Sequence, residues 1–265
     1  MNTRTADDSE TTARPDPTPS DAAERVVTPP DSGSPELVQS DDPSAEDLTT
    51  WADRLEDVQR SLVSPVADRI VVVAQTASTQ EAAARMAVAL APGDAGVLVV
   101  AGSQYAGRGT HGRGWSSGPM GLALTLALPD TNDDPQWLSL AIGLGVFRAC
   151  TSVLDPAVAG AIRVKRPNDV VLLRPDGTRA KLAGILVERR GVGGTPVTLI
   201  GVGVNVLHAQ ADWPTDLDGR AVSLAQLGSR ASRIAVAQRL LAECSRVWSM
   251  DQAEIELALA ESLID

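Results

Sequence analysis

The sequence has 265 residues, of which 43% are hydrophobic, and its 34 acidic and 23 basic residues give a net charge of −11. This length allows one sizeable domain with short attachments. It contains no apolar run of about 18 residues and no apolar signal region at its start, so it predicts neither a membrane span nor secretion, and the cytoplasm is the expected location. Both cysteines lie in apolar helical patterns, and with only two histidines besides them a structural zinc site is not expected.

The negative charge is concentrated at the amino terminus. Residues 1–50 contain 12 acidic and 3 basic side chains, which leaves 22 acidic and 20 basic residues for the rest. Residues 1–48 are rich in Pro, Ser, Thr, Asp and Glu, so they cannot bury enough apolar surface to fold and are expected to form a disordered acidic tail. Residues 49–265 are expected to form one folded domain. Its nearly neutral charge argues against binding nucleic acid through charge alone.

From Trp51 onward, the hydrophobic pattern alternates between helical and strand periods. The continuous apolar run at 121–128 is typical of a buried strand, and the Pro-Asp-Gly turn within 174–178 predicts a hairpin. Hairpins mixed with helices predict an α+β fold with a mixed, mostly antiparallel sheet flanked by helices. We expect strands at 69–74, 96–101, 121–128, 162–165, 169–173, 183–188 and 197–202, and helices from Trp51 and at 78–90, 137–154, 232–248 and 252–263.

A glycine-rich loop at 102–119 separates two of the expected strands. Its run GRGTHGRGW at 107–115 holds four glycines and two arginines. Glycines let backbone N–H groups wrap an anion, and arginines supply paired donors to phosphate or carboxylate. The spacing does not fit a Walker loop, and the proline and strand that follow argue against a dinucleotide fingerprint. We expect a lid over an anionic ligand, with a plain surface loop as the alternative.

Three further segments place polar residues or glycines beside apolar strands. KRPND at 165–169 brings Lys165, an amide and Asp169 to a turn, where they can meet a phosphate, a metal or an amine, although a charged β-turn is the alternative. KLAGIL at 181–186 and GVGVN at 201–205 carry glycines that let a flat ligand approach the strands. Ordinary packing glycines and a strand-end turn are the alternatives for these two.

Together and in this order, these segments resemble the catalytic domain of bacterial biotin–protein ligases. That family carries an S-T-N, a G-R-G-R-x-G-R-x-W loop, K-W-P-N-D, K-L-A-G-I-L-x-E and G-x-G-x-N, and this chain has STQ at 78–80, GRGTHGRGW, KRPND, KLAGILVE at 181–188 and GVGVN. The likeness spans about residues 68–250. It implies the class II synthetase-type fold of biotin and lipoate ligases. It also implies activation of biotin by ATP and Mg²⁺ to biotinoyl-AMP, and transfer of biotin to a lysine of a biotin carboxyl carrier protein.

The resemblance also implies roles for individual residues. The biotin-binding residues would be Ser78, Thr79, Gln80, Gln104, Arg108, Gly109, Thr110, Lys165, Gly184 and Ile185. The ATP-binding residues would be Arg108, Arg113, Trp115, Asn168 and Asn205, the Trp and the last Asn framing the adenine. The catalytic residues would be Lys165, Arg108, Asp169 and Lys181, and Asp169 would also hold Mg²⁺.

The chain departs from the family pattern at three positions. Gln80 replaces an Asn, Thr110 replaces the second Arg of the loop, and Arg166 replaces the Trp of the K-W-P-N-D segment. No helix-turn-helix precedes the core, so operator binding is not expected, and the family's small C-terminal β-barrel is expected to be absent. The alternatives are a non-catalytic binder of biotin or biotinoyl-AMP and a lipoate-type ligase.

Overall fold

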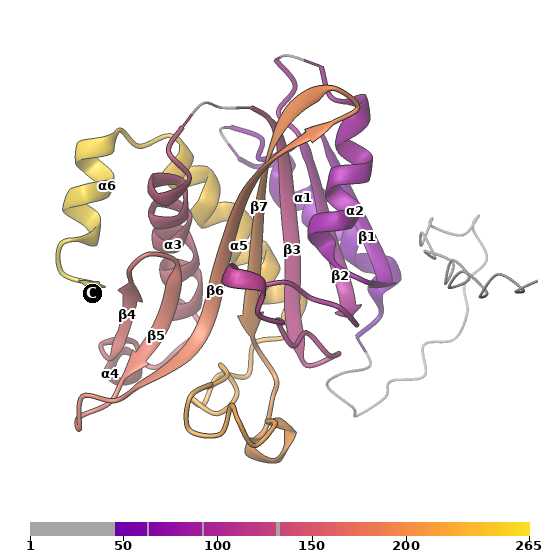
Figure 1. Ribbon diagram of the computed structural model, residues 1–265. Helices are drawn as coiled ribbons and strands as arrows, with labels where there is room; N and C mark the ends of the chain where they lie inside the picture. The colour runs from indigo at the N-terminus through magenta and orange to yellow at the C-terminus, as the bar shows by residue number, and fades with distance from the viewer. Residues whose placement is uncertain (1–45, 63, 92, 131–132) are drawn as a thin grey trace, which may run out of the picture.

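The computed structural model describes residues 46–62, 64–91, 93–130 and 133–265. Its centre is an eight-stranded sheet in the order β1-β2-β3-β7-β6-β5-β4-β8 (Figure 1). Neighbouring strands run antiparallel except in the pairs β1–β2 and β4–β8, which confirms the predicted sheet type. The strands are β1 (Arg69–Thr76), β2 (Val97–Gln104), β3 (Gly121–Pro129), β4 (Ile162–Lys165), β5 (Asp169–Leu173), β6 (Arg179–Val192), β7 (Thr195–Asn205) and β8 (Leu263–Ile264).

Local sequence accounts for where the helices begin. Asp134 caps α3 by accepting a hydrogen bond from the backbone N–H of Gln136, and Pro135 occupies the first turn, where its missing N–H costs nothing. None of the helices in the described ranges is long and apolar enough to cross a membrane. The helices are α1 (Trp51–Arg60), α2 (Thr79–Met86), α3 (Pro135–Thr151), α4 (Pro156–Ala159), α5 (Arg233–Trp248) and α6 (Gln252–Leu259), with 3-10 turns η1 (Leu48–Thr50), η2 (Ala87–Ala89), η3 (Thr110–Gly112) and η4 (Gln210–Asp212).

Helices cover both faces of the sheet, but unequally (Figure 1). Helix α2 lies on one face, where Ala83 belongs to a small apolar cluster with Val71 and Val99. Helices α1, α3 and α5 cover the other face, where a much larger cluster includes Leu55 and Ile142. Because apolar burial scales with stabilisation, most of the driving force for folding comes from this second face.

The structure differs from the predicted boundaries at strand β6 and at the last helix. Strand β6 extends beyond 183–188 because its pairing with β7 continues to Val192 opposite Thr195. The last helix ends at Leu259 rather than at 263, and Leu263–Ile264 instead form β8, which pairs with β4. A two-residue strand has no periodicity, so the sequence held no signal for it.

The predicted end of the acidic tail at residue 48 is also corrected. Glu46 pairs with the buried Arg233 of α5 at 2.9 Å, and Leu48 packs against the larger apolar cluster. The Arg233 guanidinium also donates to the carbonyl of Gly102 at 2.7 Å and lies 5.1 Å from the Trp51 ring centroid. Residues 46–48 are therefore part of the domain. The rest of the predicted tail, 1–45, lies outside the described residues.

Candidate active site

A hollow in the sheet lies on the α2 face, where side chains are small. Ala123, Gly203 and Gly184 stand opposite one another across β3, β7 and β6. Gly201 belongs to the next row, so two neighbouring glycines of β7 face the same side. The pocket over this hollow is lined by residues of all five motifs: Ser78, Thr79 and Gln80; Arg108, Gly109, Thr110 and Trp115; Asn168; Lys181, Gly184, Ile185 and Leu186; and Gly201 and Gly203.

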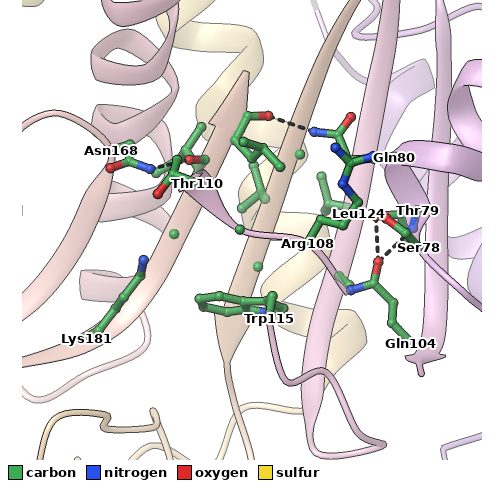
Figure 2. Close-up of a pocket in the computed structure, with 18 residues that line it drawn as sticks. Ser78, Thr79, Gln80, Gln104, Arg108, Thr110, Trp115, Leu124, Asn168 and Lys181 are labelled. Atoms are coloured by element: carbon green, nitrogen blue, oxygen red, sulfur yellow. Dashed lines mark hydrogen bonds between the residues drawn. The ribbon is translucent and has the colours of Figure 1, made fainter. Parts of the chain in front are cut away.

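Side chains of the protein itself lie over the strand glycines, and at Gly184 the nearest is Lys181, whose Cε and Nζ lie 2.8 Å from the place of a Cβ. The indole of Trp115 covers Gly203 and Gly184, so closely that a Cβ on Gly203 would overlap its Cε2 atom (Figure 2). The amide of Gln80 covers Gly201, where a Cβ would lie 2.8 Å from Nε2. The flat groups that these glycines meet here are an indole and an amide of the protein, and the approach of a flat ligand to the strands stays a prediction.

The start of α2 forms one wall of the pocket. Oε1 of Gln104 accepts hydrogen bonds from the backbone N–H of Thr79 at 2.7 Å and from its hydroxyl at 3.0 Å (Figure 2). Nε2 of Gln104 donates to the Ser117 hydroxyl at 3.1 Å, which fixes the orientation of the amide. Ser78, the residue before the helix, is buried and its side chain makes no capping hydrogen bond. The structure thus brings together Ser78, Thr79 and Gln104, as the sequence predicted.

Gln80 contributes an acceptor that has no partner. Its Nε2 donates to the carbonyl of Leu186 at 2.9 Å, which ties α2 to β6 (Figure 2). Its Oε1 is buried and accepts no hydrogen bond in the structure. A buried acceptor without a donor costs about 1–3 kcal/mol, so a ligand N–H that reached it would relieve this cost.

The glycine-rich loop is a closed hairpin rather than an open strap. Backbone hydrogen bonds join Gln104 to Ser117 at 2.8 Å and Trp115 to Gly107 at 2.9 Å. At its tip His111 has a positive φ of 58°. Thr110 lines the pocket, whereas Arg113 is exposed and does not line it. The predicted contact of Arg113 with ATP therefore remains a prediction.

The guanidinium of Arg108 is directed at carboxylates of the protein. It donates to Glu81 of α2 and, at 3.0 Å, to Glu188 of β6. Arg190 of β6 donates to the same two carboxylates, at 2.9 Å to Glu81 and 2.6 Å to Glu188. Both terminal nitrogens of Arg108 thus donate to carboxylates of the protein, and its predicted contact with the biotin carboxylate or the α-phosphate stays a prediction.

Lys181 and Asp169 meet at the opposite side of the pocket. Nζ of Lys181 lies 2.5 Å from Oδ1 of Asp169 and 5.3 Å from the Trp115 ring centroid. Nζ of Lys165 instead donates to the carbonyl of Arg166 at 3.2 Å, beside the cis Arg166–Pro167 peptide bond, and Lys165 does not line the pocket. Of the two lysines predicted to be catalytic, the structure places Lys181 at the site.

Three other residues that were predicted to bind biotin or ATP contact the backbone or the core of the protein instead. Asn168 lines the pocket, but its Nδ2 donates to the carbonyl of Ile185 at 2.7 Å (Figure 2). Ile185 borders the pocket only through its backbone: its side chain points to α3, where it would meet a Cβ on Gly143. Asn205 is buried outside the pocket and its Nδ2 donates to the carbonyls of Lys181 and Val222, at 3.0 and 3.2 Å. Strand alternation gives the physical reason for Ile185, because its neighbour Gly184 faces the pocket.

Sequence reasoning missed the residues that surround the loop. Glu81 lies in the first turn of α2, where an acidic residue is common, and Arg190 belongs to no motif. Both belong to segments that fold onto the loop from distant positions, and opposite charges far apart in the sequence give no pairing signal on their own. In the described ranges, no group of three His, Cys, Asp or Glu side chains is arranged to hold a metal ion.

Several known proteins are similar to this chain. Residues 72–205 match the model of the biotin/lipoate A/B protein ligase family. The biotin–[acetyl-CoA-carboxylase] ligase of Mycobacterium tuberculosis is 37% identical over 195 residues, which are 71% of this chain and 67% of that protein. The ligase of the same name from Paracoccus denitrificans is 37% identical over 130 residues, 46% of this chain and 50% of that protein, so the chain covers only half of its length.

A solved structure shows the same arrangement of elements. The biotin protein ligase of Aquifex aeolicus in complex with biotin and ATP has a TM-score of 0.55 and 26% identity, over 68% of this chain and 70% of that one. The family match runs from β1 to the end of β7 and thus includes all five motifs that line the pocket. The chain belongs to the biotin/lipoate A/B protein ligase family and has the catalytic domain of a biotin–protein ligase.

Proposed function

We propose that this chain activates biotin with ATP to form biotinoyl-AMP and then transfers biotin to a lysine of a biotin carboxyl carrier protein. One observation carries the proposal: five short segments, spread from residue 78 to 205, converge on one pocket. The named activities of the relatives in Mycobacterium tuberculosis and Paracoccus denitrificans support it.

The pocket offers complementary groups to a flat, polar ring. The unpartnered Oε1 of Gln80 can accept an N–H, and the hydroxyl of Ser78, which makes no capping hydrogen bond, can donate to a carbonyl oxygen. The indole of Trp115 over Gly203 gives the apolar part of a ligand a wall to pack against. A ureido ring with an aliphatic chain, as in biotin, has these features.

The first step joins two anions and therefore needs positive charge. A carboxylate oxygen of biotin attacks the α-phosphorus of ATP, the bond to the bridging oxygen breaks, and pyrophosphate leaves with the electron pair. Two cations line the pocket, Arg108 and Lys181. Arg108 is paired with Glu81 and Glu188, so we assign this role to Lys181, whose position beside Asp169 holds its Nζ in place. A fixed charge that faces a developing charge lowers the barrier without reorganisation.

Mg²⁺ would enter with the nucleotide rather than bind a preformed cage. Mg²⁺ is commonly held by one or two carboxylates together with substrate phosphates and water. Asp169 is the carboxylate next to the pocket, and its buried Oδ1 has no aligned hydrogen-bond donor, although Lys181 lies close to it. Mg²⁺ bound there would neutralise charge on the phosphates.

The second step needs an amine and a dry intermediate. The lysine amine of the acceptor attacks the acyl carbon of biotinoyl-AMP, the carbon–oxygen bond breaks, AMP leaves with the electron pair, and the amine loses a proton. The hairpin of the glycine-rich loop lies over the pocket and would shield the mixed anhydride from water.

Mass measurement of an acceptor tests the proposal. The protein is incubated with biotin, ATP and Mg²⁺ and an isolated biotin carboxyl carrier domain. The expected result is a mass increase equal to biotin minus water, lost when ATP is omitted or when the acceptor lysine is changed to arginine. An equal rate with lipoate in place of biotin would instead indicate a lipoate-type ligase. Bound biotin without any modified acceptor or AMP would indicate a non-catalytic binder and contradict the proposal.

A further inference from the structure

We propose that Glu188 and Arg190 are positioning residues of the reaction, which with Glu81 hold Arg108, and thereby the glycine-rich loop, over the pocket. The expected change in KM rests on the proposed function, whereas the expected hold on the loop does not. Arg108 is the member of this group that the loop supplies, whereas Glu81 comes from α2 and the other two from β6.

The four side chains form a closed ring of ion pairs. Each arginine donates to both glutamates through its two terminal nitrogens, and each glutamate accepts from both arginines. Arg190 and Glu188 lie two residues apart on β6, so strand alternation directs both to the α2 face, where the pocket lies. The planar guanidinium suits such bridging, because its donors have a fixed geometry.

The charges in the ring link the position of the loop to the binding of anions. With Arg108 removed from the ring, Glu81, Glu188 and Arg190 carry a net charge of −1 at the edge of the pocket. That charge would repel a carboxylate and a triphosphate. When Arg108 docks, the ring becomes neutral and the loop lies over the pocket. Docking of the loop therefore favours the binding of anionic substrates without any contact between them and the guanidinium.

The surroundings of the ring are consistent with strong pairing. Burial alone would raise the pKa of the Glu81 carboxyl, but its hydrogen bonds and charge interactions with Arg190 and Arg108 outweigh this and hold the pKa below its ordinary value. The side chains of Arg190 and Glu188 are 22% and 24% exposed, whereas those of Arg108 and Glu81 are 45% and 39% exposed, so the β6 half of the ring is the better shielded half. The loop has a second anchor in Trp115, whose indole lies on Gly203, so the ring and the indole hold two separate points of one hairpin.

Limited trypsin digestion measures how often the glycine-rich loop opens, and it needs no substrate. Arg113 is exposed near the tip of the loop, and cleavage there requires the hairpin to open. In Glu188→Gln and Glu81→Gln, each of which removes one carboxylate partner of Arg108, we expect cleavage after Arg113 to be about fivefold faster than in the unaltered protein, the upper range for loss of a partly exposed ion pair. Arg189→Gln is the matched control, because Arg189 is adjacent on β6 but pairs with Asp130 at 3.1 Å instead.

Steady-state kinetics then separates positioning from a general loss of structure. If only molecules with a docked loop bind biotin, the apparent affinity for biotin equals the intrinsic affinity multiplied by the docked fraction. Saturating biotin draws all molecules into the docked state, so the maximal rate is restored. We expect KM for biotin to rise about fivefold in both variants while kcat stays nearly unchanged. Unchanged cleavage after Arg113 in both variants, with melting temperatures equal to that of Arg189→Gln, would overturn the inference. If the unaltered protein modifies no acceptor, the proposed function fails, and the digestion still reports on the ring.

Discussion

Two lysines predicted to be catalytic behave differently in the structure. Lys181 lines the pocket beside Asp169, whereas Lys165 donates to a nearby backbone carbonyl and lies outside the lining. We expect Lys181→Gln to lower the rate of biotinoyl-AMP formation by about two to three orders of magnitude, the usual cost of losing one preorganised charge contact. Pyrophosphate release in a single turnover measures this, with Lys165→Gln as the comparison. A larger loss in Lys165→Gln would show that bound substrates recruit Lys165 and would reverse the ranking.

Gly203 is the residue on which the Trp115 indole rests. A methyl group there would overlap the ring, so Gly203→Ala should displace the indole from the sheet. Overpacking of this kind typically costs about 1–3 kcal/mol, and 1.4 kcal/mol corresponds to a tenfold change in binding. We expect biotin to bind about tenfold more weakly by calorimetry.

Gly191→Ala is the matched control for this change. Gly191 lies on β6, and a Cβ there would meet nothing within 4 Å. If both variants bound biotin as tightly as the unaltered protein, the indole would have no part in the pocket wall.

His208 links one residue to the pH dependence of stability. It is buried and stacked on Trp213 with ring centroids 4.4 Å apart. Burial lowers the pKa of His208, and the charge of Asp212 opposes this only in part. The unfolded chain, with a histidine pKa of about 6.5, then binds the proton first, so the free energy of unfolding is fully present above about pH 6.5 and falls as the pH drops toward the folded pKa.

Thermal melts across this range test the role of His208. We expect the melting temperature to decline between about pH 6.5 and 5 in the unaltered protein and to decline less in His208→Phe, which keeps a stacking ring and cannot be protonated. The carboxyl of Glu81, whose pKa is also lowered, acts at a lower pH: its stabilisation is lost as the pH falls below about 4.3. Parallel curves for the two proteins above pH 5 would exclude His208 as the source.

At the scale of elements, the amino-terminal turn can be separated from the acidic residues before it. Deletion of residues 1–45 is expected to leave the melting temperature unchanged, because their composition does not favour packing. Deletion of residues 1–48 also removes Glu46, the carboxylate that pairs with the buried Arg233. Breaking a buried pair typically costs about 3–5 kcal/mol, which for a domain of this size means a fall of roughly 10 °C.

Scanning calorimetry on the two truncated proteins distinguishes them. The substitution Glu46→Gln in the full chain serves as a control, since it removes the charge and leaves the backbone turn Leu48–Thr50 in place. Equal melting temperatures for both truncations would mean that Arg233 is stabilised without Glu46.

The glycine-rich loop has a threonine where the family pattern has its second arginine. Thr110 lines the pocket but can make neither a bidentate nor a charge-assisted hydrogen bond to an anionic intermediate. Such bonds contribute about 1.5–3 kcal/mol, and 1.4 kcal/mol is a tenfold change in rate. We expect Thr110→Arg to slow the release of biotinoyl-AMP about tenfold and to raise the yield of modified acceptor per ATP.

Release after a single turnover measures this effect. The intermediate is formed without acceptor, and its appearance in solution is followed for both proteins. Identical release rates would mean that the ion-pair ring and the Trp115 indole already hold the loop, and that position 110 adds nothing.

At the scale of the whole molecule, the order of elements was predictable and their lateral pairing was not. Continuous apolar runs such as 121–128 and the Pro-Asp-Gly turn specified strands and a hairpin, because these signals are local. The ring at Arg108 depends on which strands lie side by side, and Arg190 reaches Glu81 across 109 positions of sequence. Periodicity cannot encode such a contact. The motif letters predicted which segments meet, but they did not predict that Lys165 and the Ile185 side chain would face away.

The two faces of the sheet divide the requirements placed on this protein. On the α2 face, Gly184, Gly201 and Gly203 have no side chains, so this part of the sheet buries little apolar surface. The face under α1, α3 and α5 holds the larger apolar cluster. Substitutions that change ligand preference can therefore accumulate on the first face with little effect on folding, and substitutions that raise stability can accumulate on the second with little effect on the ligand. In such a sheet, selection can act on ligand binding and on stability almost independently. This weakens the usual trade-off between stability and activity.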